Sequence, residues 1–314
     1  MNFAEVVKKE IINKQIKDRH CKKAFLAGLV RGSGTLYEKD GELGLDFKVN
    51  SEEMAMIVAN YFHVLFNYEF REISVSEDRL NKRDKFVLTI SGSETNRILK
   101  ELEILIEEDG EEAVNLKFYS GITEKECCLK AFIRGLFVAV GNCTVPTPED
   151  SINTGYHLEL SFSHYTPALQ TSEKLAENNV ITKITRKRES YIVYIKSAEE
   201  IKDFIAFLPA PVSVLKLTDL MINREIVNDS NRRKNCDLGN VNRQIEASTK
   251  QIEAIERIEQ TIGLENLKPD LKVVAFARKE NPDETLVELA ERLQVTKSCL
   301  NHRLRKIVCI ANEL

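Results

Sequence analysis

The sequence lacks the features that mark several large classes of protein. Its 45 Lys and Arg residues are outnumbered by 49 Asp and Glu, which excludes a nucleic-acid binder that is basic overall, so any basic surface must be local. No apolar run approaches the ~20 residues that a membrane helix needs. Residues 1–11 form a charged, amphipathic start that is unlike a signal peptide. These absences predict a cytoplasmic protein with no membrane partner.

Metal-binding and disulfide patterns are also missing. The seven cysteines are an odd number, none of them forms a C-x-x-C pair, and only five histidines are present. A zinc site and a disulfide framework are therefore both disfavoured. The cysteines are those expected of a reduced, cytosolic protein. The sequence predicts neither a metal nor a cofactor.

What the chain does contain is a copy of part of itself. Residues 21–34 (CKKAFLAGLVRGSG) align without gaps with residues 128–141 (CLKAFIRGLFVAVG), with identities at Cys, Lys, Ala, Phe, Gly, Leu and Gly. The same series of patterns follows each copy, namely strands, a helix, two β-rich runs and a closing amphipathic helix. Each half is therefore predicted to fold as αββαββα, in repeats at about residues 20–112 and 127–210.

These repeats define the predicted organisation of the chain. Residues 1–210 form one duplicated α+β domain, residues 211–239 form a linker, and residues 240–314 form a separate all-α domain. The polar segment 228–240 (NDSNRRKNCDLGN) is interpreted as a hinge or an interaction segment, and a plain linker is the simpler alternative. The isoleucines of residues 240–262 recur at helical spacing, and Gly263 is a natural stop for that helix.

The duplicated part resembles the LAGLIDADG homing-endonuclease family. The match is carried by residues 26–34 (LAGLVRGSG) and 133–141 (IRGLFVAVG). The resemblance implies that these two helices pack on each other at the centre of the domain, and that the four-stranded sheet of each half lies on DNA. Small residues in both helices suit a close approach of the two backbones, because a helical Gly should have a packing reason. These residues are Ala27, Gly28, Gly32, Gly135 and Ala139.

The positions that would make this family a nuclease have changed. In the family an acidic residue precedes the last Gly of each motif, and the two carboxylates hold divalent metal. Here those positions are Ser33 and Val140. A hydroxyl is a poor lone ligand for a hard cation, and an isopropyl group is no ligand. The other acidic position of each motif is replaced by Arg31 and Val138. The resemblance therefore implies no catalytic residue; an active or residual endonuclease with displaced metal ligands is the alternative.

Local basic charge occurs in two places before the C-terminal domain. Residues 182–196 (TKITRKRESYIVYIK) carry four neighbouring cations that suit phosphate contacts, although a hairpin with ordinary solvated charges explains them equally well. These cations are Lys183, Arg186, Lys187 and Arg188. The polar segment adds a run of three, Arg232, Arg233 and Lys234. Both groups are candidates for a secondary DNA contact.

Residues 269–312 have the pattern of a helix-turn-helix. A helix over 270–279 stops at Asn281-Pro282, a second helix covers 286–293, and Thr296 caps a third. Gln294 replaces the usual Gly of the turn, which requires a tolerant turn geometry. The inner face of the third helix is Leu300, Leu304, Ile307 and Val308. Its outward side chains can bond base edges or phosphates, and they are Lys297, Ser298, Asn301, His302, Arg305 and Lys306. The alternative is a small helical module that binds protein.

The combination of a degenerate LAGLIDADG-like duplication with this helix-turn-helix resembles the WhiA family, the sporulation and cell-division regulators of Gram-positive bacteria. The segments that carry the match are residues 3–11, 21–36, 127–141, 156–159, 235–236 and 298–307. The resemblance implies a transcription regulator or a nucleoid-associated factor in septation and chromosome segregation, with double-stranded DNA as its partner. An RNA-binding, maturase-like protein is a further alternative, but side chains cannot read the deep groove of A-form RNA. A scaffold that acts through protein contacts is another.

Overall fold

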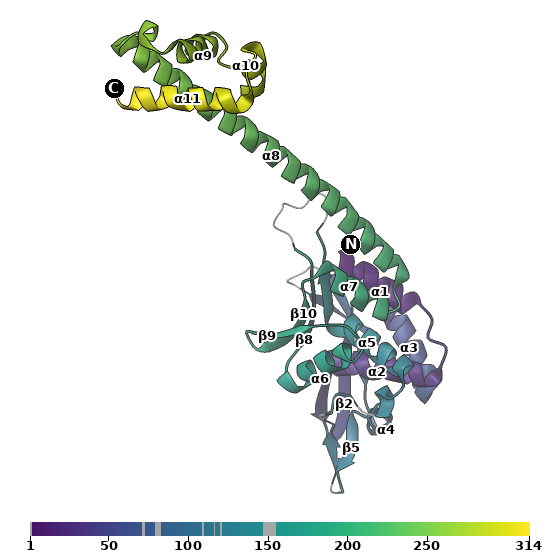
Figure 1. Cartoon of the computed structure of the whole chain (residues 1–314). Coiled ribbons are helices and arrows are strands. Elements are labelled where there is room, and N and C mark those ends of the chain that lie inside the picture. Colours follow the sequence, from purple (N-terminus) through teal and green to yellow (C-terminus); the bar gives the residue numbers. More distant parts are fainter. Residues whose placement is uncertain are drawn as a thin grey trace. The chain divides into compact units, whose positions relative to one another are not determined.

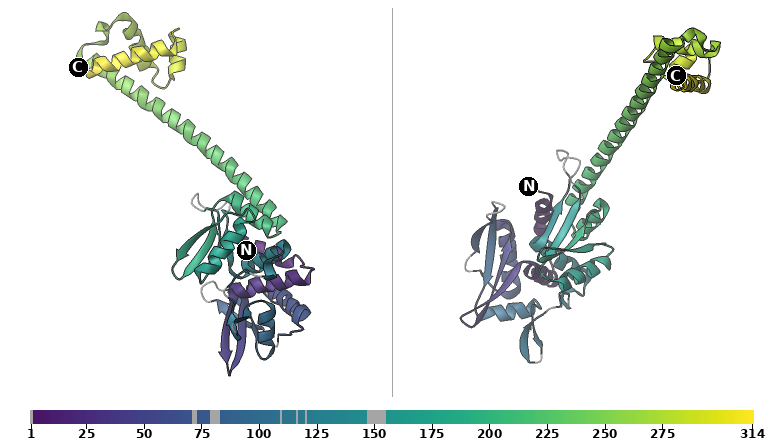
Figure 2. Two further views of the ribbon diagram at one scale, coloured as in Figure 1. Left: turned by 60° about the horizontal axis from the view of Figure 1, so that its bottom comes forward. Right: turned by 90° about the vertical axis from the view of Figure 1, so that its left-hand side faces the viewer.

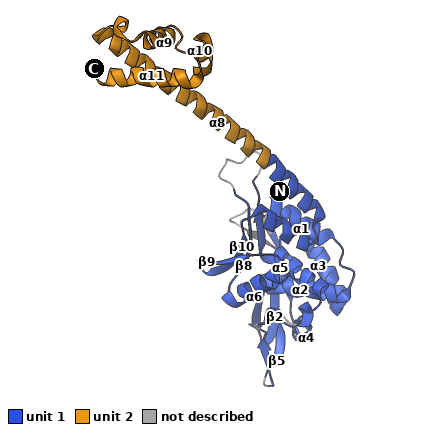
Figure 3. Cartoon of the chain, in the orientation of Figure 1, with its two compact units in different colours: residues 1–224 blue, residues 225–314 orange. Residues whose placement is uncertain are grey.

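The computed structural model describes residues 2–70, 73–78, 83–108, 110–115, 117–119, 121–146 and 155–314. The chain divides into two compact units, residues 1–224 and 225–314 (Figure 3). Each unit encloses a hydrophobic core of its own. Within the described residues, no helix combines the length and the apolar character needed to cross a membrane.

Unit 1 holds two copies of one αββαββα arrangement, as the sequence predicts. The first copy consists of α2 (Arg19–Ser33), β1 (Gly34–Lys39), β2 (Glu42–Val49), α3 (Glu52–Phe66), β3 (Ile73–Asp78), β4 (Arg83–Ile90) and α4 (Glu94–Glu101). The second consists of α5 (Glu126–Val140), β7 (Gly141–Thr144), β8 (His157–Phe162), α6 (Tyr165–Ala176), β9 (Lys183–Lys187), β10 (Ser190–Ile195) and α7 (Ala198–Phe207). The two antiparallel sheets have the same strand order, β1-β2-β4-β3 and β7-β8-β10-β9.

The two copies meet through α2 and α5, which lie side by side at the centre of unit 1 (Figures 1 and 2). A Cβ atom on Gly28 would lie 2.1 Å from the carbonyl oxygen of Phe132, and one on Gly135 would lie 2.0 Å from that of Phe25. The helices therefore touch backbone to backbone at both glycines. Only a residue without a side chain permits this approach, which confirms the interpretation of the small residues.

Each four-stranded sheet buries one face against helices and leaves the other face open. In the second sheet, Leu158, Leu160 and Phe162 of β8 are buried, while the residues between them are only half-buried. The partners of these three residues on β10 are also turned to the helical side. Alternation along a strand thus decides which side chains reach the open face.

The closing helix of the first copy is shorter than its sequence pattern suggests. The amphipathic pattern of the predicted closing helix extends over residues 93–106 (SETNRILKELEILI). However, α4 ends at Glu101, and β5 (Leu105–Glu108) pairs with β6 (Glu111–Val114) as a hairpin. Glu103 adopts a left-handed backbone with φ of 54°. The Ile104 N–H then donates to the carbonyl of Leu99, which ends the helix as a C-terminal cap does.

Before the repeats, α1 (Phe3–Asn13) begins with a capping box between Asn2 and Glu5. Its Glu10 carboxylate accepts hydrogen bonds of 2.8 Å from the N–H groups of Val212 and Ser213. These N–H groups belong to the first turn of α8 (Pro211–Thr261), so a side chain of α1 caps α8.

Helix α8 spans the predicted linker at residues 211–239, which is therefore helical. Residues 228–240, interpreted above as a hinge or an interaction segment, are helical throughout. The segment contains no proline and a single glycine, Gly239, and its Arg and Lys residues are good helix formers. Its polarity reflects exposure and did not indicate a break in the helix. The helix ends before Gly263, which has φ of 79°, as expected.

Unit 2 is all-helical. The last turns of α8 pack with η2 (Leu264–Asn266), α9 (Pro269–Glu280), α10 (Leu286–Arg292) and α11 (Lys297–Asn312). Ala254, Ile255 and Ile258 are the α8 residues that enter this core. The duplicated α+β part and the all-helical part therefore agree with the predicted fold class.

Candidate nucleic-acid interface

Helices α10 and α11 form the predicted helix-turn-helix, and the turn between them depends on Gln294. This residue has φ of 50°, in the left-handed region where glycine is usually found. The N–H of Gln294 donates to the carbonyl of Glu291 at 3.1 Å, and the N–H of Val295 donates to that of Ala290 at 2.9 Å. This pair of bonds is a Schellman cap, so the turn has the geometry of a glycine turn without the glycine.

The inner face of α11 fixes the rotation of that helix about its axis. Leu300, Leu304 and Ile307 are completely buried, and Val308 is half-buried. Thr296 caps the helix by accepting a hydrogen bond from the Cys299 N–H at 3.2 Å. With this face held in the core, the opposite face of the helix must point outward.

The outward face of α11 carries the six predicted contact residues. Five of them are exposed and Asn301 is half-buried. They recur along the helix at intervals that place them in one stripe. The stripe consists of Lys297, Ser298, Asn301, His302, Arg305 and Lys306.

The cations of this stripe are available for an outside partner. Within the described part of the chain, no carboxylate forms an ion pair with Lys297, Arg305 or Lys306. By contrast, Arg303 lies 3.8 Å from Asp270 of α9. The helix thus keeps one Arg within the unit and presents the other cations to solvent.

The positions of the lost carboxylates lie at the C-terminal ends of α2 and α5. The Ser33 hydroxyl donates to the carbonyl of Leu29 at 3.1 Å, so it is occupied by its own helix. Val140 is half-buried and offers no ligand atom. In the described ranges, His, Cys, Asp and Glu side chains do not gather in threes at these ends. Ser33 and Val140 themselves therefore supply no carboxylate for a catalytic cation.

The residues that replaced the other acidic positions have become structural. The Arg31 guanidinium donates to the carbonyl oxygens of Glu103 and Asn115, at 2.6 and 3.1 Å, and lies over the Phe118 ring. Burial lowers the pKa of Arg31 to about 10, although Glu103 opposes the shift. Val138 is buried in the core. Arg31 therefore ties α2 to the hairpin that follows α4.

One cluster was missed by the sequence analysis. His20 and Cys21 at the start of α2 lie beside Cys127 and Cys128 of α5, and their ligand atoms are all within 4.8 Å of one another. The absence of a C-x-x-C pair concealed this cluster, because its members come from two helices. The signal that could have found it was the alignment of Cys21 with Cys128 in the two repeats.

The four basic residues near β9 do not share one surface. Lys183 and Lys187 pair with Tyr194 and Ser190 of β10 and lie on the open face of the second sheet. Arg186 pairs with Tyr191 on the opposite face and lies over its ring at 5.8 Å.

Arg188 is in the turn between the two strands, with φ of 56°. Lys196, beyond the end of β10, lies 5.4 Å from the ring of Tyr194. Alternation places it on the same open face as Lys183 and Lys187. That face therefore offers three lysines, Lys183, Lys187 and Lys196.

The run Arg232, Arg233 and Lys234 is exposed on α8. Arg232 pairs with Asp229, one turn earlier, at 2.8 Å. Ala254, the first α8 residue in the core of unit 2, follows 22 residues later, or about 33 Å along a helix. Between them, Arg243 lines a pocket together with Lys297 of the α11 stripe, about 14 Å along the helix from Lys234.

Comparison with known proteins matches the chain along its length. Family models match at residues 19–105 (WhiA N-terminal LAGLIDADG-like domain), 129–227 (WhiA LAGLIDADG-like domain) and 230–311 (WhiA C-terminal HTH domain). A protein of Brevibacillus brevis named "Probable cell division protein WhiA" is 34% identical, with 100% of this chain and 98% of that protein covered. A protein of the same name from Bacillus velezensis is also 34% identical, with 100% and 97% covered.

Solved structures agree in fold. Full-length DUF199/WhiA from Thermatoga maritima superposes with a TM-score of 0.57 at 24% identity, and the match covers 100% of this chain and 99% of that one. The N-terminal LAGLIDADG domain of DUF199/WhiA superposes with a TM-score of 0.50 at 22% identity, covering 66% and 89%. Since the family models cover most of the chain and the curated relatives align over all of it, this chain belongs to the WhiA family.

Proposed function

We propose that this protein is a DNA-binding regulator of cell division that does not cut DNA. It acts as a transcription regulator or a nucleoid-associated factor in the cytoplasm, in processes that include sporulation and chromosome segregation. The observation that carries the proposal is the outward stripe of α11, whose cations have no described carboxylate partner and whose opposite face is locked in the core. The name of the relatives, cell division protein, supplies the cellular process.

The chemistry of the stripe suits the major groove of duplex DNA. Asn301 and Arg305 can bond base edges, since Asn pairs with adenine and Arg with guanine through two hydrogen bonds. Lys297 and Lys306 carry charge suited to phosphates, which position a protein without reading sequence. The N-terminal part of a recognition helix contacts the bases in this motif. Lys297, Ser298 and Asn301 occupy that part of α11.

Binding of a preferred duplex and a random duplex, each measured against salt, tests this role. Replacing Asn301 or Arg305 with Ala should weaken binding to the preferred site by about 1–3 kcal/mol and narrow its advantage over random DNA. Lys306→Ala should weaken both duplexes alike and reduce the salt slope by about one.

Arg303→Ala is the matched control, because Arg303 is on the same helix but pairs with Asp270. It should leave the preference for one sequence unchanged. If the Asn301 and Arg305 variants distinguish the two duplexes as the unaltered protein does, α11 is not the reading helix. An RNA duplex of the same sequence, tested in parallel, should bind more weakly, and stronger binding to RNA would contradict the proposal.

The absence of nuclease activity has its own test. The protein should not nick supercoiled plasmid in the presence of Mg²⁺ or Mn²⁺, because Ser33 and Val140 cannot supply the two carboxylates. Nicking that requires the metal and is lost in the Ser33→Ala variant would show that this site is active after all.

The open face of the second sheet is a proposed secondary contact. Lys183, Lys187 and Lys196 lie on this face, so a variant with all three replaced by Gln should lose affinity for every sequence and show a lower salt slope. An Arg186→Gln variant is the control, because Arg186 lies on the other face. Equal losses in the two variants would argue against a specific role for this face.

A further inference from the structure

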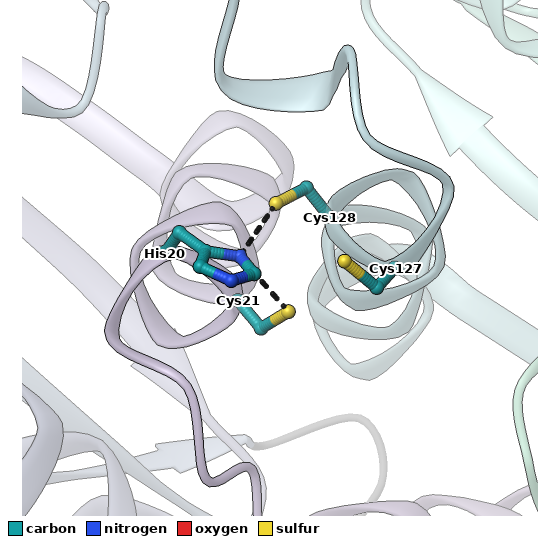
Figure 4. Close-up of side chains that lie close together, drawn as sticks. All are labelled: His20, Cys21, Cys127 and Cys128. Carbon is teal, nitrogen blue, oxygen red and sulfur yellow. Dashed lines mark hydrogen bonds between the residues drawn. The ribbon is translucent and has the colours of Figure 1, made fainter.

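Four side chains with metal-binding atoms converge between the first turns of α2 and α5 (Figure 4). His20 and Cys21 come from α2, and Cys127 and Cys128 come from α5. The Nδ1 atom of His20 lies 3.1 Å from the Sγ of Cys128 and 3.3 Å from the Sγ of Cys21. No pair among the four ligand atoms is more than 4.8 Å apart. The group is thus one imidazole nitrogen and three sulfurs around a common centre.

These separations are close to those of a tetrahedral zinc site. With Zn–S bonds of about 2.3 Å and Zn–N bonds of about 2.0–2.1 Å, the ligand atoms of a tetrahedron lie about 3.5–3.8 Å from one another. The separations in the cluster, from 3.1 Å to at most 4.8 Å, differ from these values by about 1 Å or less.

The fold itself brings these residues together. Phe25, one turn after Cys21, presents the carbonyl that lies against Gly135, and Phe132, one turn after Cys128, presents the carbonyl that lies against Gly28. The backbone contact therefore brings the starts of the two helices, and the cysteines on them, close to each other. Cys21 and Cys128 also occupy equivalent positions of the two repeats. The cluster is therefore a product of the duplication.

The cluster is separate from the place where LAGLIDADG nucleases bind metal. Cys21 precedes Ser33 by 12 residues of the same helix, which is about 18 Å. Its ligand set also differs, because it contains thiols and an imidazole and no carboxylate. Sulfur and imidazole ligands select zinc and other soft or borderline cations over Mg²⁺, Ca²⁺ or Mn²⁺.

The surroundings suit a cation that is bound by thiolates. Cys21 and Cys128 are buried, while His20 and Cys127 are exposed and leave a path for the ion. Cys21 and the pair Cys127 and Cys128 lie in the first turns of their helices, where the helix dipole favours negative charge. A bound cation favours the deprotonated thiols and releases their protons.

We propose that Cys21, Cys127, Cys128 and the Nδ1 of His20 bind one Zn²⁺ ion that clamps the two repeats together. All four coordination positions are filled by protein, so the site is structural and has no open position for a reactant. The ion bridges α2 and α5 at their N-terminal ends, one helical turn before their backbone contacts. Its loss should loosen the interface between the repeats without removing any residue of the α11 stripe.

Metal analysis of the full-length protein tests the proposal, with the protein purified without a histidine tag under reducing conditions. We expect about one zinc per chain. Replacing zinc with Co²⁺ should give the visible absorption of a tetrahedral cobalt thiolate. Cys127→Ser and His20→Gln change exposed ligands, so they should fold, and each should weaken zinc binding at least about tenfold in chelator competition.

Two matched variants separate the cluster from other thiols and imidazoles. Cys236→Ser changes an exposed cysteine on α8, and His63→Gln changes an exposed histidine on α3. Both should keep zinc and the cobalt spectrum. Chelation should lower the thermal midpoint of the unaltered protein, since an ion that binds only the folded state stabilises it.

Several results would overturn the proposal. One is an unaltered protein that neither contains zinc nor takes up cobalt with thiolate absorption. A second is equal zinc retention by the Cys127→Ser and Cys236→Ser variants. A third is a disulfide between Cys21 and either Cys127 or Cys128 in freshly isolated protein, detected by mass after alkylation. The cobalt spectrum of the unaltered protein decides the matter even if a variant fails to fold.

Discussion

The central helices of unit 1 and the outer helix of unit 2 are held in place by different kinds of contact. Helices α2 and α5 touch through their backbones at Gly28 and Gly135, where there is no room for a side chain. Helix α11 packs on its neighbours through side chains such as Leu300 and Leu304. The spacing of α2 and α5 is therefore set by the absence of a side chain at two glycines. The spacing of α11 from its neighbours is set by the volume of its buried side chains.

The difference shows where each helix can change. The backbone contacts at Gly28 and Gly135 do not involve Ser33 or Val140, so the carboxylates of the LAGLIDADG nucleases could be lost while these contacts survived. On α11 the inner face must stay apolar, but the outward stripe contributes little to the core and can be adapted to a DNA sequence. On α11 the packing residues are therefore distinct from the proposed contact residues.

The largest effect should come from adding one methyl group to the central pair. A Cβ at Gly28 or Gly135 would overlap the facing carbonyl oxygen, so the helices must separate along their length. We expect Gly28→Ala and Gly135→Ala each to lower the free energy of unfolding by more than about 4 kcal/mol, or to abolish soluble expression. Denaturant unfolding followed by circular dichroism measures this.

Gly239→Ala provides the matched control. Gly239 is also in a helix, but its added Cβ would meet nothing closer than the Arg243 side chain at 3.7 Å. This substitution should stabilise α8 by up to about 1 kcal/mol, because Ala is a better helix former. If Gly28→Ala unfolds at the same denaturant concentration as the unaltered protein, the backbone contact between the repeats is not as close as described.

In unit 2 the corresponding test is a side-chain deletion. Leu300→Ala should cost about 2–5 kcal/mol, because Leu300 is completely buried and the cavity cannot fully collapse. Arg305→Ala on the outward side of the same helix should change stability by less than about 0.5 kcal/mol. Thermal unfolding of the two full-length variants distinguishes them. Equal stability losses would mean that α11 is rotated from the position described.

A buried lysine gives a pH-dependent effect in unit 1. Lys8 of α1 is buried, with its ammonium 5.8 Å from the ring centre of Phe137 on α5. Burial, and secondly the charge of Lys85, lowers its pKa from 10.5 to about 8. Below pH 8 the lysine is charged in both the folded and the unfolded chain, so the full cost of burying the charge, up to about 3 kcal/mol, opposes folding.

Between pH 8 and 10.5 the unfolded chain binds this proton and the folded one does not, so stability should rise with pH in that window. Lys8→Met should therefore raise stability at pH 7 and flatten the rise. Lys9→Met is the control, because exposed Lys9 makes only a 3.8 Å ion pair with Glu53 and should change stability by less than about 1 kcal/mol. If the stability of a Lys8→Met variant rises with pH as steeply as that of the unaltered protein, the pKa of Lys8 is not lowered as described.

Most of the fold was predictable because the duplication doubled a local signal. Each strand and helix pattern occurs twice in the same order, so weak patterns supported one another. The end of α4 was mispredicted because an amphipathic pattern continues through Glu103 without showing that this residue is left-handed. The continuity of α8 was missed because the polar residues after 228 are exposed and show no apolar periodicity. Their intrinsic propensity is nevertheless sufficient for a helix.

The candidate site was predictable only where it depends on local periodicity. The outward stripe of α11 follows directly from the inner apolar residues. The separation of Arg186 from Lys183 and Lys187 also follows from strand alternation, once the strand is known. The His20, Cys21, Cys127 and Cys128 cluster depends on the packing of two helices from different repeats, and along the chain it is indicated only by the alignment of Cys21 with Cys128 in those repeats.

The smallest predicted effect lies in the turn before α11. Gln294 has a left-handed backbone, which costs a residue with a Cβ roughly 1–2 kcal/mol, and glycine avoids that cost while losing more freedom on folding. Gln294→Gly should therefore stabilise unit 2 by about 0.5–1 kcal/mol, which is the relieved backbone strain less the greater loss of conformational entropy of glycine. Gln294→Ala keeps the Cβ and should give no gain.

Because the Schellman bonds use only backbone atoms, the angle between α10 and α11 should survive, and DNA affinity should stay within about twofold. Denaturant unfolding and duplex binding of the two variants measure both effects. If Gly is no more stabilising than Ala, the turn relaxes in solution and the strain assigned to Gln294 is absent.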